Sequence, residues 1–270
     1  MRNLKLTLSY DGSEFAGWQV QPGLPTIQGA LASAIGRLTG ENVLPQGSGR
    51  TDAGVHALAQ VASFTTASPI PIDNWLKALN DILPPSIRVL LVAEAAADFH
   101  ARRSAQAKTY HYRIYRGAIC PPFLARYVWH YPFPLQEDRM AEAAGMVVGE
   151  HDFTSFAAVD PERVERLEKG NYSAHGGEKR NAEGKVTEVT NVRTIFSSAW
   201  ALEGDELIYT VRGNGFLHHM VRNLVGTFLL IGKGTLTSED FPRILASHSR
   251  SAAGPTAPAS GLYLVNVEYE

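Results

Sequence analysis

The glycine-rich stretch Gly47–His56, with the sequence Gly-Ser-Gly-Arg-Thr-Asp-Ala-Gly-Val-His, constrains the fold of this chain more than any other feature. Its three glycines predict a sharp turn that another segment or a ligand can approach closely. The apolar run over residues 57–64 then predicts a largely buried strand. Arg50 and Asp52 therefore lie on a turn just before the start of a core strand. They mark either a functional site or a surface turn in which the Asp52 carboxylate caps local N–H groups.

The composition is typical of a globular protein with a sizeable core. The chain has 270 residues, of which 44% are hydrophobic and 19% charged, enough for one large domain or two intimate ones. No apolar run reaches the roughly 18 residues that a membrane span needs, and the first residues do not resemble a signal peptide. We therefore expect a cytoplasmic protein with no membrane contact.

Two classes of site have little support in the sequence. The single cysteine, Cys120, excludes an intrachain disulfide and a cysteine-rich metal site. Neither a P-loop nor a convincing set of metal ligands is present. We therefore expect no cofactor and no metal.

The charge is unevenly distributed, although the formal net charge is only −2. A weakly acidic total argues against a nucleic-acid-binding protein, because such proteins usually carry a basic excess. One short stretch without acidic residues nevertheless concentrates positive charge in Arg102, Arg103, Lys108, Arg113 and Arg116. This basic stretch is either a local positive track for RNA or a solvated face.

Alternating strand and helix patterns predict an α+β fold in two halves. Residues 1–104 read β-α-β-α-β and carry the Asp52 loop, whereas residues 105–270 read β-α-β-β-α-α-β. We expect two ferredoxin-like halves that form one mixed, mostly antiparallel sheet with flanking helices and a central cleft. The scarcity of apolar residues in 157–185 predicts a mobile insertion, with one helical turn near 161–168.

Capping residues set the expected ends of the first two helices. Thr26 should begin the first helix and Gly40 should end it. Asp73 should cap the second helix, which follows two chain-breaking prolines.

A further helix is predicted from Phe216 to about Ile231, and it carries one cation in an otherwise apolar string. This cation, Arg222, either is buried beside a carboxylate or faces solvent. The neighbouring His218 and His219 are not expected to bind a metal, because consecutive residues of a helix point about 100° apart.

A strand over residues 107–115 alternates between an aromatic and a basic face. Tyr110 and Tyr112 share one face, whereas His111 and Arg113 share the other. Aromatic rings beside cations suit RNA, whose bases stack and whose phosphates pair with cations. Alternatively, the tyrosines pack inward against the core.

Five strings, in order along the chain, resemble the motifs of the tRNA pseudouridine synthase A family. They lie at residues 10–19, 49–56, 108–112, 216–223 and 257–262. The resemblance implies the fold described above and a homodimer with tRNA lying across both subunits. It also implies cofactor-free isomerisation of uridine to pseudouridine in the anticodon stem-loop, at tRNA positions 38, 39 and 40. The segment 157–185 is longer than the resemblance leads us to expect.

The resemblance also assigns roles to single residues. Asp52 is the essential carboxylate, and whether it attacks the sugar or the base or abstracts a sugar proton stays open. Arg222 would keep Asp52 ionised by charge pairing, and Tyr110 would stack on the uracil and help remove the C5 proton. Arg50 would hold the phosphate of the extruded nucleotide or fill the gap in the stack. Leu262 would pack on the other face of the base.

Contact with the RNA backbone is assigned to the basic stretch, and in particular to Arg102, Arg103 and Lys108. Two other functions are considered: an RNA-binding module without catalysis, and a small-molecule hydrolase with Asp52 as nucleophile. A pure binder has no need of an Arg-x-Asp turn together with an arginine in an apolar helix. A hydrolase should show a metal site or a second carboxylate near the turn.

Overall fold

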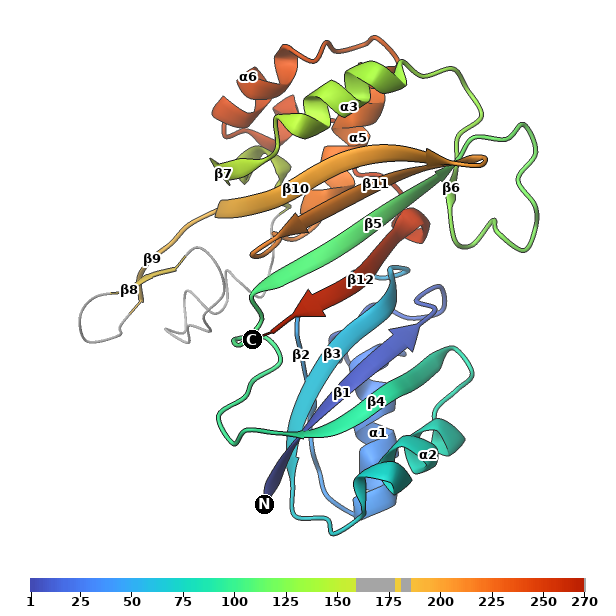
Figure 1. The fold of residues 1–270 in the computed structure, drawn as a ribbon, viewed down its shortest axis with the longest axis vertical. Helices are drawn as coiled ribbons and strands as arrows, with labels where there is room; N and C mark the ends of the chain where they lie inside the picture. Colours follow the sequence, from blue (N-terminus) through green and yellow to red (C-terminus); the bar gives the residue numbers. More distant parts are fainter. Residues whose placement is uncertain (159–177, 181–185, 270) are drawn as a thin grey trace. The chain divides into compact units, whose positions relative to one another are not determined.

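The computed structural model describes residues 1–158, 178–180 and 186–269. The chain forms two compact units: unit 1 comprises Met1–Lys108 with Ala259–Glu270, and unit 2 comprises Thr109–Pro258 (Figure 1). The predicted division at 104/105 lies close to the first boundary. The C-terminal segment, however, was predicted for the second half and is found in unit 1. None of the helices in the described part of the chain is long and apolar enough to cross a membrane.

Unit 1 is built on a sheet in the strand order β4-β1-β3-β12. Strand β1 pairs antiparallel with both β3 and β4, β12 joins β3 in parallel, and the short β2 also pairs with β3. The elements of unit 1 are β1 (Arg2–Tyr10), α1 (Ile27–Thr39), β2 (Gln46–Gly47), β3 (His56–Thr66), α2 (Ile72–Ile82), β4 (Ile87–Ala95), η3 (Ala259–Gly261) and β12 (Leu262–Glu268). The β-α-β-α-β order predicted for the first third is therefore confirmed, with β2 added.

The caps of α1 are those that the sequence predicts. The Thr26 hydroxyl oxygen accepts a hydrogen bond from the Gly29 N–H at 3.2 Å, and Gly40 ends the helix with φ +74°. The expectation for α2 is wrong, because this helix follows Pro71 and has no side-chain cap. Asp73 instead lies in its first turn, where a carboxylate favours the positive end of the helix dipole.

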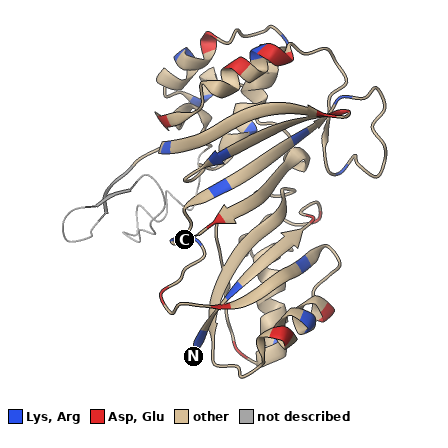
Figure 2. Ribbon diagram, viewed as in Figure 1, with Lys and Arg blue, Asp and Glu red and all other residues tan. Residues whose placement is uncertain are grey.

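The core of unit 1 follows from the alternation in β1. Leu4, Leu6 and Leu8 are fully buried, whereas the residues between them are half-buried. The helices contribute their own buried stripes, with Leu31 on α1 and Trp75 on α2. The charged residues of α2, which are Asp73, Lys77 and Asp81, are exposed. The strands of the sheet carry few charged residues (Figure 2).

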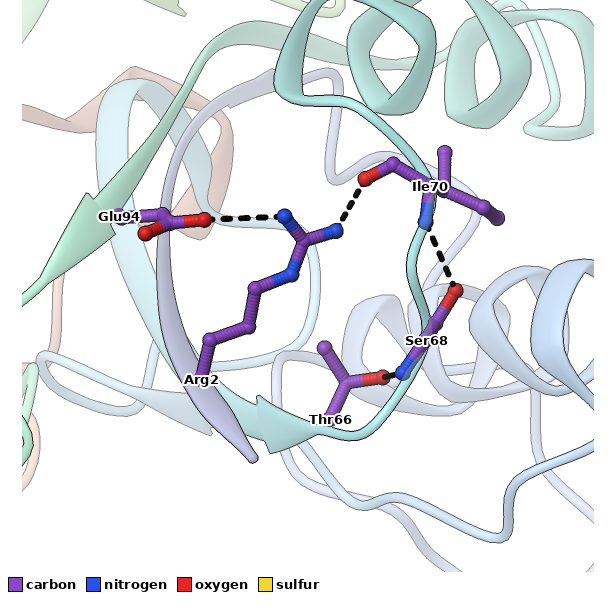
Figure 3. Close-up of polar contacts among 5 residues, drawn as sticks. All are labelled: Arg2, Thr66, Ser68, Ile70 and Glu94. Carbon is purple, nitrogen blue, oxygen red and sulfur yellow. Dashed lines mark hydrogen bonds and ion pairs between the residues drawn. The ribbon is translucent and has the colours of Figure 1, made fainter.

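Arg2 ties the start of β1 to its neighbours (Figure 3). Its guanidinium donates to the Glu94 carboxylate at 2.9 Å and to the Ile70 carbonyl oxygen. The Ile70 N–H donates in turn to the Ser68 hydroxyl at 3.4 Å, and the Ser68 N–H donates to the Thr66 hydroxyl at 3.0 Å. These contacts fix the loop between β3 and α2, which the sequence marks only by its prolines.

Unit 2 is built on a sheet in the order β5-β11-β10-β7, with β6 beside β5. Helices α3, α5 and α6 lie together on one side of its strands (Figure 1). A separate antiparallel pair, β8 with β9, was not predicted. The elements of unit 2 are β5 (Ala107–Tyr115, which begins in unit 1), β6 (Trp129–His130), α3 (Glu137–Gly145), β7 (Gly149–Asp152), η1 (Thr154–Phe156), β8 (Glu178–Arg180), β9 (Val186–Val189), β10 (Val192–Glu203), β11 (Glu206–Gly213), α5 (Met220–Gly232), α6 (Asp240–Ala246) and η2 (Arg250–Ala252).

The hairpin predicted at residues 203–205 is confirmed. Glu203 and Glu206 face each other across β10 and β11, and Gly204 adopts φ +61° in the connecting turn. The helical turn expected near 161–168 lies outside the described residues. The described strands and helices agree with the predicted fold class, α+β with mostly antiparallel strand pairing.

Helix α5 begins four residues later than predicted, at Met220 rather than Phe216. His219 adopts φ +60°, a left-handed conformation that does not continue a helix. His218 and His219 therefore precede the helix, and their ring centroids lie 4.0 Å apart. Helical geometry therefore does not separate these two rings, and this expectation from the sequence is wrong.

Gly226→Ala should destabilise unit 2 by about 1–3 kcal/mol or more. The added β-carbon would lie 1.7 Å from the backbone oxygen of Pro255, so one of the two segments would have to move. Gly145→Ala is the matched control, because Gly145 is also helical and no atom lies within 4 Å of the added β-carbon. Urea unfolding followed by circular dichroism measures both variants. Equal unfolding midpoints would contradict the close approach of the two segments.

Candidate active site

The turn that carries Asp52 is held from one side by the segment before α1. The Trp18 N–H donates to the Thr51 carbonyl oxygen at 3.0 Å, and the Gly54 N–H donates to the Phe15 carbonyl oxygen at 3.3 Å. The backbone on both sides of Asp52 is therefore bonded to residues 15–18. This segment belongs to the first of the five motifs, so that motif contributes a scaffold for the turn.

Two glycines of the same segment allow this contact. A β-carbon added at Gly12 would lie 2.0 Å from the Val55 carbonyl oxygen, and one added at Gly17 would lie 2.5 Å from the Thr51 carbonyl oxygen. Gly17 also adopts φ +91°, which side chains disfavour. Only glycine therefore lets the two backbones touch at these points.

A buried polar network supports the turn from its other side. The Tyr10 hydroxyl lies 2.9 Å from the Thr51 hydroxyl, the Gln60 amide donates to the Gly49 carbonyl oxygen at 3.0 Å, and the Ser48 hydroxyl donates to Gln60 Oε1 at 2.6 Å. Burial raises the pKa of Tyr10 to about 12, against the opposing effect of its hydrogen bonds to Thr51 and Gln60. The phenol thus stays protonated near neutral pH. Sequence reasoning missed this network, although a glutamine within an apolar strand was a signal for it.

Arg50 and Asp52 are both half-buried on this turn. The Asp52 carbonyl oxygen accepts from the Val55 N–H at 3.1 Å, which closes the chain into a tight bend. The bend presents a carboxylate and a guanidinium from one rigid segment. This agrees with the placement that the glycine pattern predicts.

Strand β12 brings Leu262 to the same turn. Tyr263 pairs with His56, the first residue of β3, so Leu262 lies beside the end of the turn. A β-carbon added at Gly54 would lie 3.3 Å from the Ala259 β-carbon, so the residues before Leu262 also contact the turn. Leu262 is 6% exposed. Unit 1 therefore brings Arg50, Asp52 and Leu262 together.

Most cations of the basic stretch have internal partners. Lys108 is 7% exposed, and its ammonium group donates to the Ser48 carbonyl oxygen at 2.6 Å, beneath the Asp52 turn. Arg113 forms two bonds with the Glu206 carboxylate, at 2.6 and 2.7 Å. Arg116 pairs with the carboxylate of Glu137 at 3.3 Å.

Arg102 and Arg103 lie in the loop that precedes β5. Arg103 is exposed and Arg102 half-buried, and the backbone N–H groups of both donate to His100 Nδ1, at 3.4 and 3.1 Å. Burial, and then the charge of Arg103, lowers the pKa of His100. A neutral imidazole is the form that accepts these bonds, so the loop holds both arginines in an ordered backbone.

The aromatic face of β5 packs inward. Tyr110 is 7% exposed and Tyr112 is fully buried, whereas His111 and Arg113 on the other face are half-buried. The ring of Tyr110 meets that of Phe216 edge to face at 4.9 Å. The predicted alternation is therefore confirmed.

Arg222 is half-buried on α5 and is bonded to the segment that follows α6. Its Nε donates to the Ala257 carbonyl oxygen at 2.7 Å, and its carbonyl oxygen accepts from the Ala257 N–H at 3.1 Å. Burial raises the pKa of Tyr112, whereas the charge of Arg222 opposes this shift. The Tyr112 hydroxyl donates to the Pro258 carbonyl oxygen at 2.7 Å.

The predicted site residues are divided between the two units. Tyr110 and Arg222 belong to unit 2. Unit 1 holds the remaining ones, which are Arg50, Asp52, Arg102, Arg103, Lys108 and Leu262.

Comparison with known proteins places the chain in a family. The sequence model described as tRNA pseudouridine synthase matches residues 7–102 and 143–270. The first range contains the Asp52 turn and the second contains the Arg222 helix. Lys108 and Tyr110 fall between the two ranges.

Three bacterial proteins named tRNA pseudouridine synthase A match over nearly their whole length. That of Solibacter usitatus is 49% identical over 269 residues, covering 100% of both chains. That of Moorella thermoacetica is 45% identical over 268 residues, covering 98% of this chain and 99% of the relative. That of Brevibacillus brevis is 44% identical over 269 residues, covering 100% of both chains. The family predicted from the five motifs is confirmed: this chain belongs to the tRNA pseudouridine synthase family of isomerases.

Proposed function

We propose that this chain isomerises uridine to pseudouridine in the anticodon stem-loop of tRNA, with Asp52 as the essential carboxylate. The observation that carries the proposal is the rigid support of the Asp52 turn. Residues 15–18 hold its backbone on one side, and the network of Tyr10 and Gln60 supports the other. A carboxylate fixed in this way is oriented before substrate arrives, which lowers the entropic part of the barrier.

The reaction rearranges bonds without net gain or loss of atoms. The N1–C1′ bond breaks, the uracil turns while it is held, and a C5–C1′ bond forms. C5 loses its proton and N1 gains one, so no oxidant, reductant or external group is consumed. Asp52 acts as a nucleophile or as the base that takes a sugar proton, and both roles require its ionised form. Arg222 is proposed as the cation that favours this form.

The target base has to leave its stack before any chemistry can occur. We assign to Tyr110 one face of the extruded uracil and the removal of the C5 proton, and to Leu262 the other face. Arg50 then contacts the phosphate of the extruded nucleotide or fills the gap in the stack. Leu262 and Arg50 flank Asp52 on the same turn and its neighbouring strand, which supports these roles.

For the RNA backbone the proposal rests on Arg102 and Arg103, which are half-buried and exposed, respectively. Lys108 has a second role as a support of the turn, because its ammonium group is bonded to Ser48. A homodimer that binds one tRNA across both subunits is part of the same proposal.

Asp52→Asn should abolish turnover and leave tRNA affinity within a few-fold of the unmodified protein, because the amide keeps the shape of the side chain and loses its charge. Release of tritium from C5-tritiated uridine in an unmodified tRNA measures turnover, and filter binding measures affinity. Asp73→Asn is the control, since Asp73 is an exposed carboxylate on α2 and should keep full activity. Substantial release of tritium by Asp52→Asn would refute the central role of this residue.

Arg222→Met should lower the single-turnover rate strongly while tRNA affinity stays within a few-fold. Methionine fills much of the same volume but provides neither the charge nor the Nε donor that meets Ala257. Arg243→Met serves as the control, because the side chain of Arg243 is 75% exposed and pairs with the neighbouring Asp240 on α6. A folded Arg222→Met protein with the unmodified rate would remove Arg222 from the mechanism.

Arg102→Glu combined with Arg103→Glu should weaken tRNA binding and reduce the slope of log Kd against log salt by about 1 for each phosphate contact that is lost. The control reverses the charges of Arg37 and Lys77, two exposed cations on the helices of unit 1. The two double variants have the same net charge, so a difference between them reports local contact. Equal slopes would move the RNA track away from the 102–103 loop.

A further inference from the structure

A buried polar cluster joins α5 to residues 253–258. Asn223 is fully buried, and its Oδ1 accepts from the Thr256 hydroxyl at 2.7 Å and from Arg250 Nη2 at 2.9 Å. Its Nδ2 donates to the Phe156 carbonyl oxygen at 2.7 Å. The amide is thus bonded through both of its polar atoms, as a buried polar group requires.

One turn further along α5, the helix and the segment touch through their backbones. The buried Thr227 hydroxyl donates to the Asn223 carbonyl oxygen and accepts from the Gly254 N–H, both at 2.8 Å. A β-carbon added at Gly254 would lie 2.7 Å from the Gly226 carbonyl group. No side chain separates the helix from the segment at this point, so a small shift of one must move the other.

Arg250 bonds to both parts of this junction. Its Nη1 donates to the Gly254 carbonyl oxygen at 2.9 Å and lies 3.4 Å from that of Ala253, whereas Nη2 donates to Asn223 and, at 3.2 Å, to Thr256. The planar guanidinium can hold several acceptors at fixed angles, which a lysine ammonium group on its flexible stem does not do.

The charge of Arg250 is not explained by ion pairing. Within the described residues its hydrogen-bond partners are all neutral oxygens. Burial lowers the pKa of Arg250, which means that its surroundings disfavour the charged form. A cation placed there costs desolvation, and in the described part of the chain no carboxylate is bonded to Arg250 to offset this cost. The several N–H donors of the guanidinium, rather than its charge, therefore explain why an arginine occupies this position.

The held segment contains the group that orients Arg222. Ala257 follows Thr256 directly and makes two bonds to Arg222, one through its carbonyl oxygen to Nε and one through its N–H. The carbonyl oxygen of Pro258, the next residue, accepts a hydrogen bond from the Tyr112 hydroxyl. The charge of Arg222 acts on the pKa of this hydroxyl. The direction of the Arg222 guanidinium therefore depends on where residues 253–258 lie on α5.

We propose that Arg250 is a positioning residue for Arg222: it fixes residues 253–258 on α5 and thereby fixes the Ala257 carbonyl group that orients the Arg222 guanidinium. This inference rests on the proposed role of Arg222 in the isomerisation. It assigns Arg250 no contact with the tRNA.

Arg250→Met should lower the single-turnover rate by about tenfold to a hundredfold, the range expected when a catalytic group is displaced by about 1 Å. The tRNA Kd and its salt dependence should stay unchanged, because the guanidinium is bonded within the protein. Arg250→Lys should resemble Arg250→Met, since charge alone does not supply the fork. Arg243→Met on α6 is again the control and should keep the unmodified rate. A salt slope reduced by about 1 would overturn the inference in favour of a phosphate contact.

A double-variant cycle separates an effect through Arg222 from a general loss of stability. Arg222→Lys keeps the charge but loses the Nε that bonds to Ala257. In the Arg222→Lys background, Arg250→Met should therefore cost little further rate, so the two losses are not multiplicative. Fully multiplicative losses would show that Arg250 acts by another route and would overturn the inference.

Thr256→Val provides a milder second variant in case Arg250→Met does not fold. It removes one donor to Asn223 at nearly constant volume, and its smaller rate loss should likewise disappear in the Arg222→Lys background. This inference alone would be overturned if Arg250→Met or Thr256→Val kept the single-turnover rate of the protein without substitutions while Arg222→Met lowered that rate. A fully active Arg222→Met would instead refute the proposed role of Arg222, independently of the result at Arg250.

Discussion

Contact between two backbones at Gly12 and Gly17 is the constraint on which the Asp52 site depends. Any side chain at these positions would separate residues 10–18 from the turn by the width of a β-carbon. The hydrogen bonds from Trp18 and to Phe15 need this contact, and so does the burial of the network beneath it. The position of Asp52 is therefore determined by its support on two sides rather than by the conformation of its own segment.

Unit 2 uses the same construction around Arg222. Gly226 and Gly254 bring the segment after α6 onto the backbone of α5, and a buried polar cluster built on Asn223 fills the neighbouring space. In both units, two backbone segments touch at glycines, so no side chain fits between them. Beside each contact lies a hydrogen-bonded polar network instead of a purely apolar interior. Such networks specify one arrangement, because a shift would leave buried donors and acceptors unpaired.

Local patterns predicted much of the fold, and the failures have physical causes. The cap of α1 and the hairpin at Gly204 follow from short-range chemistry and are confirmed. Strand β12 belongs to unit 1 because it pairs with β3, about 200 residues away in the sequence. The local hydrophobic pattern of a strand does not indicate which distant strand it pairs with. The start of α5 was misplaced because a left-handed His219 leaves no mark in the hydrophobic pattern. The candidate site residues were predicted from their resemblance to family motifs. The distribution of charge along the sequence did not indicate that Lys108 is buried.

The parallel pairing of β12 with β3 has a consequence for the synthesis of the protein. Unit 1 contains residues from both sides of unit 2 in the sequence, so its sheet lacks one strand until Leu262–Glu268 have left the ribosome. Throughout translation of unit 2, the nascent chain carries the Asp52 turn without Ala259 and Leu262 beside it. Strand β12 thus completes the flank of a turn that emerged about 200 residues earlier.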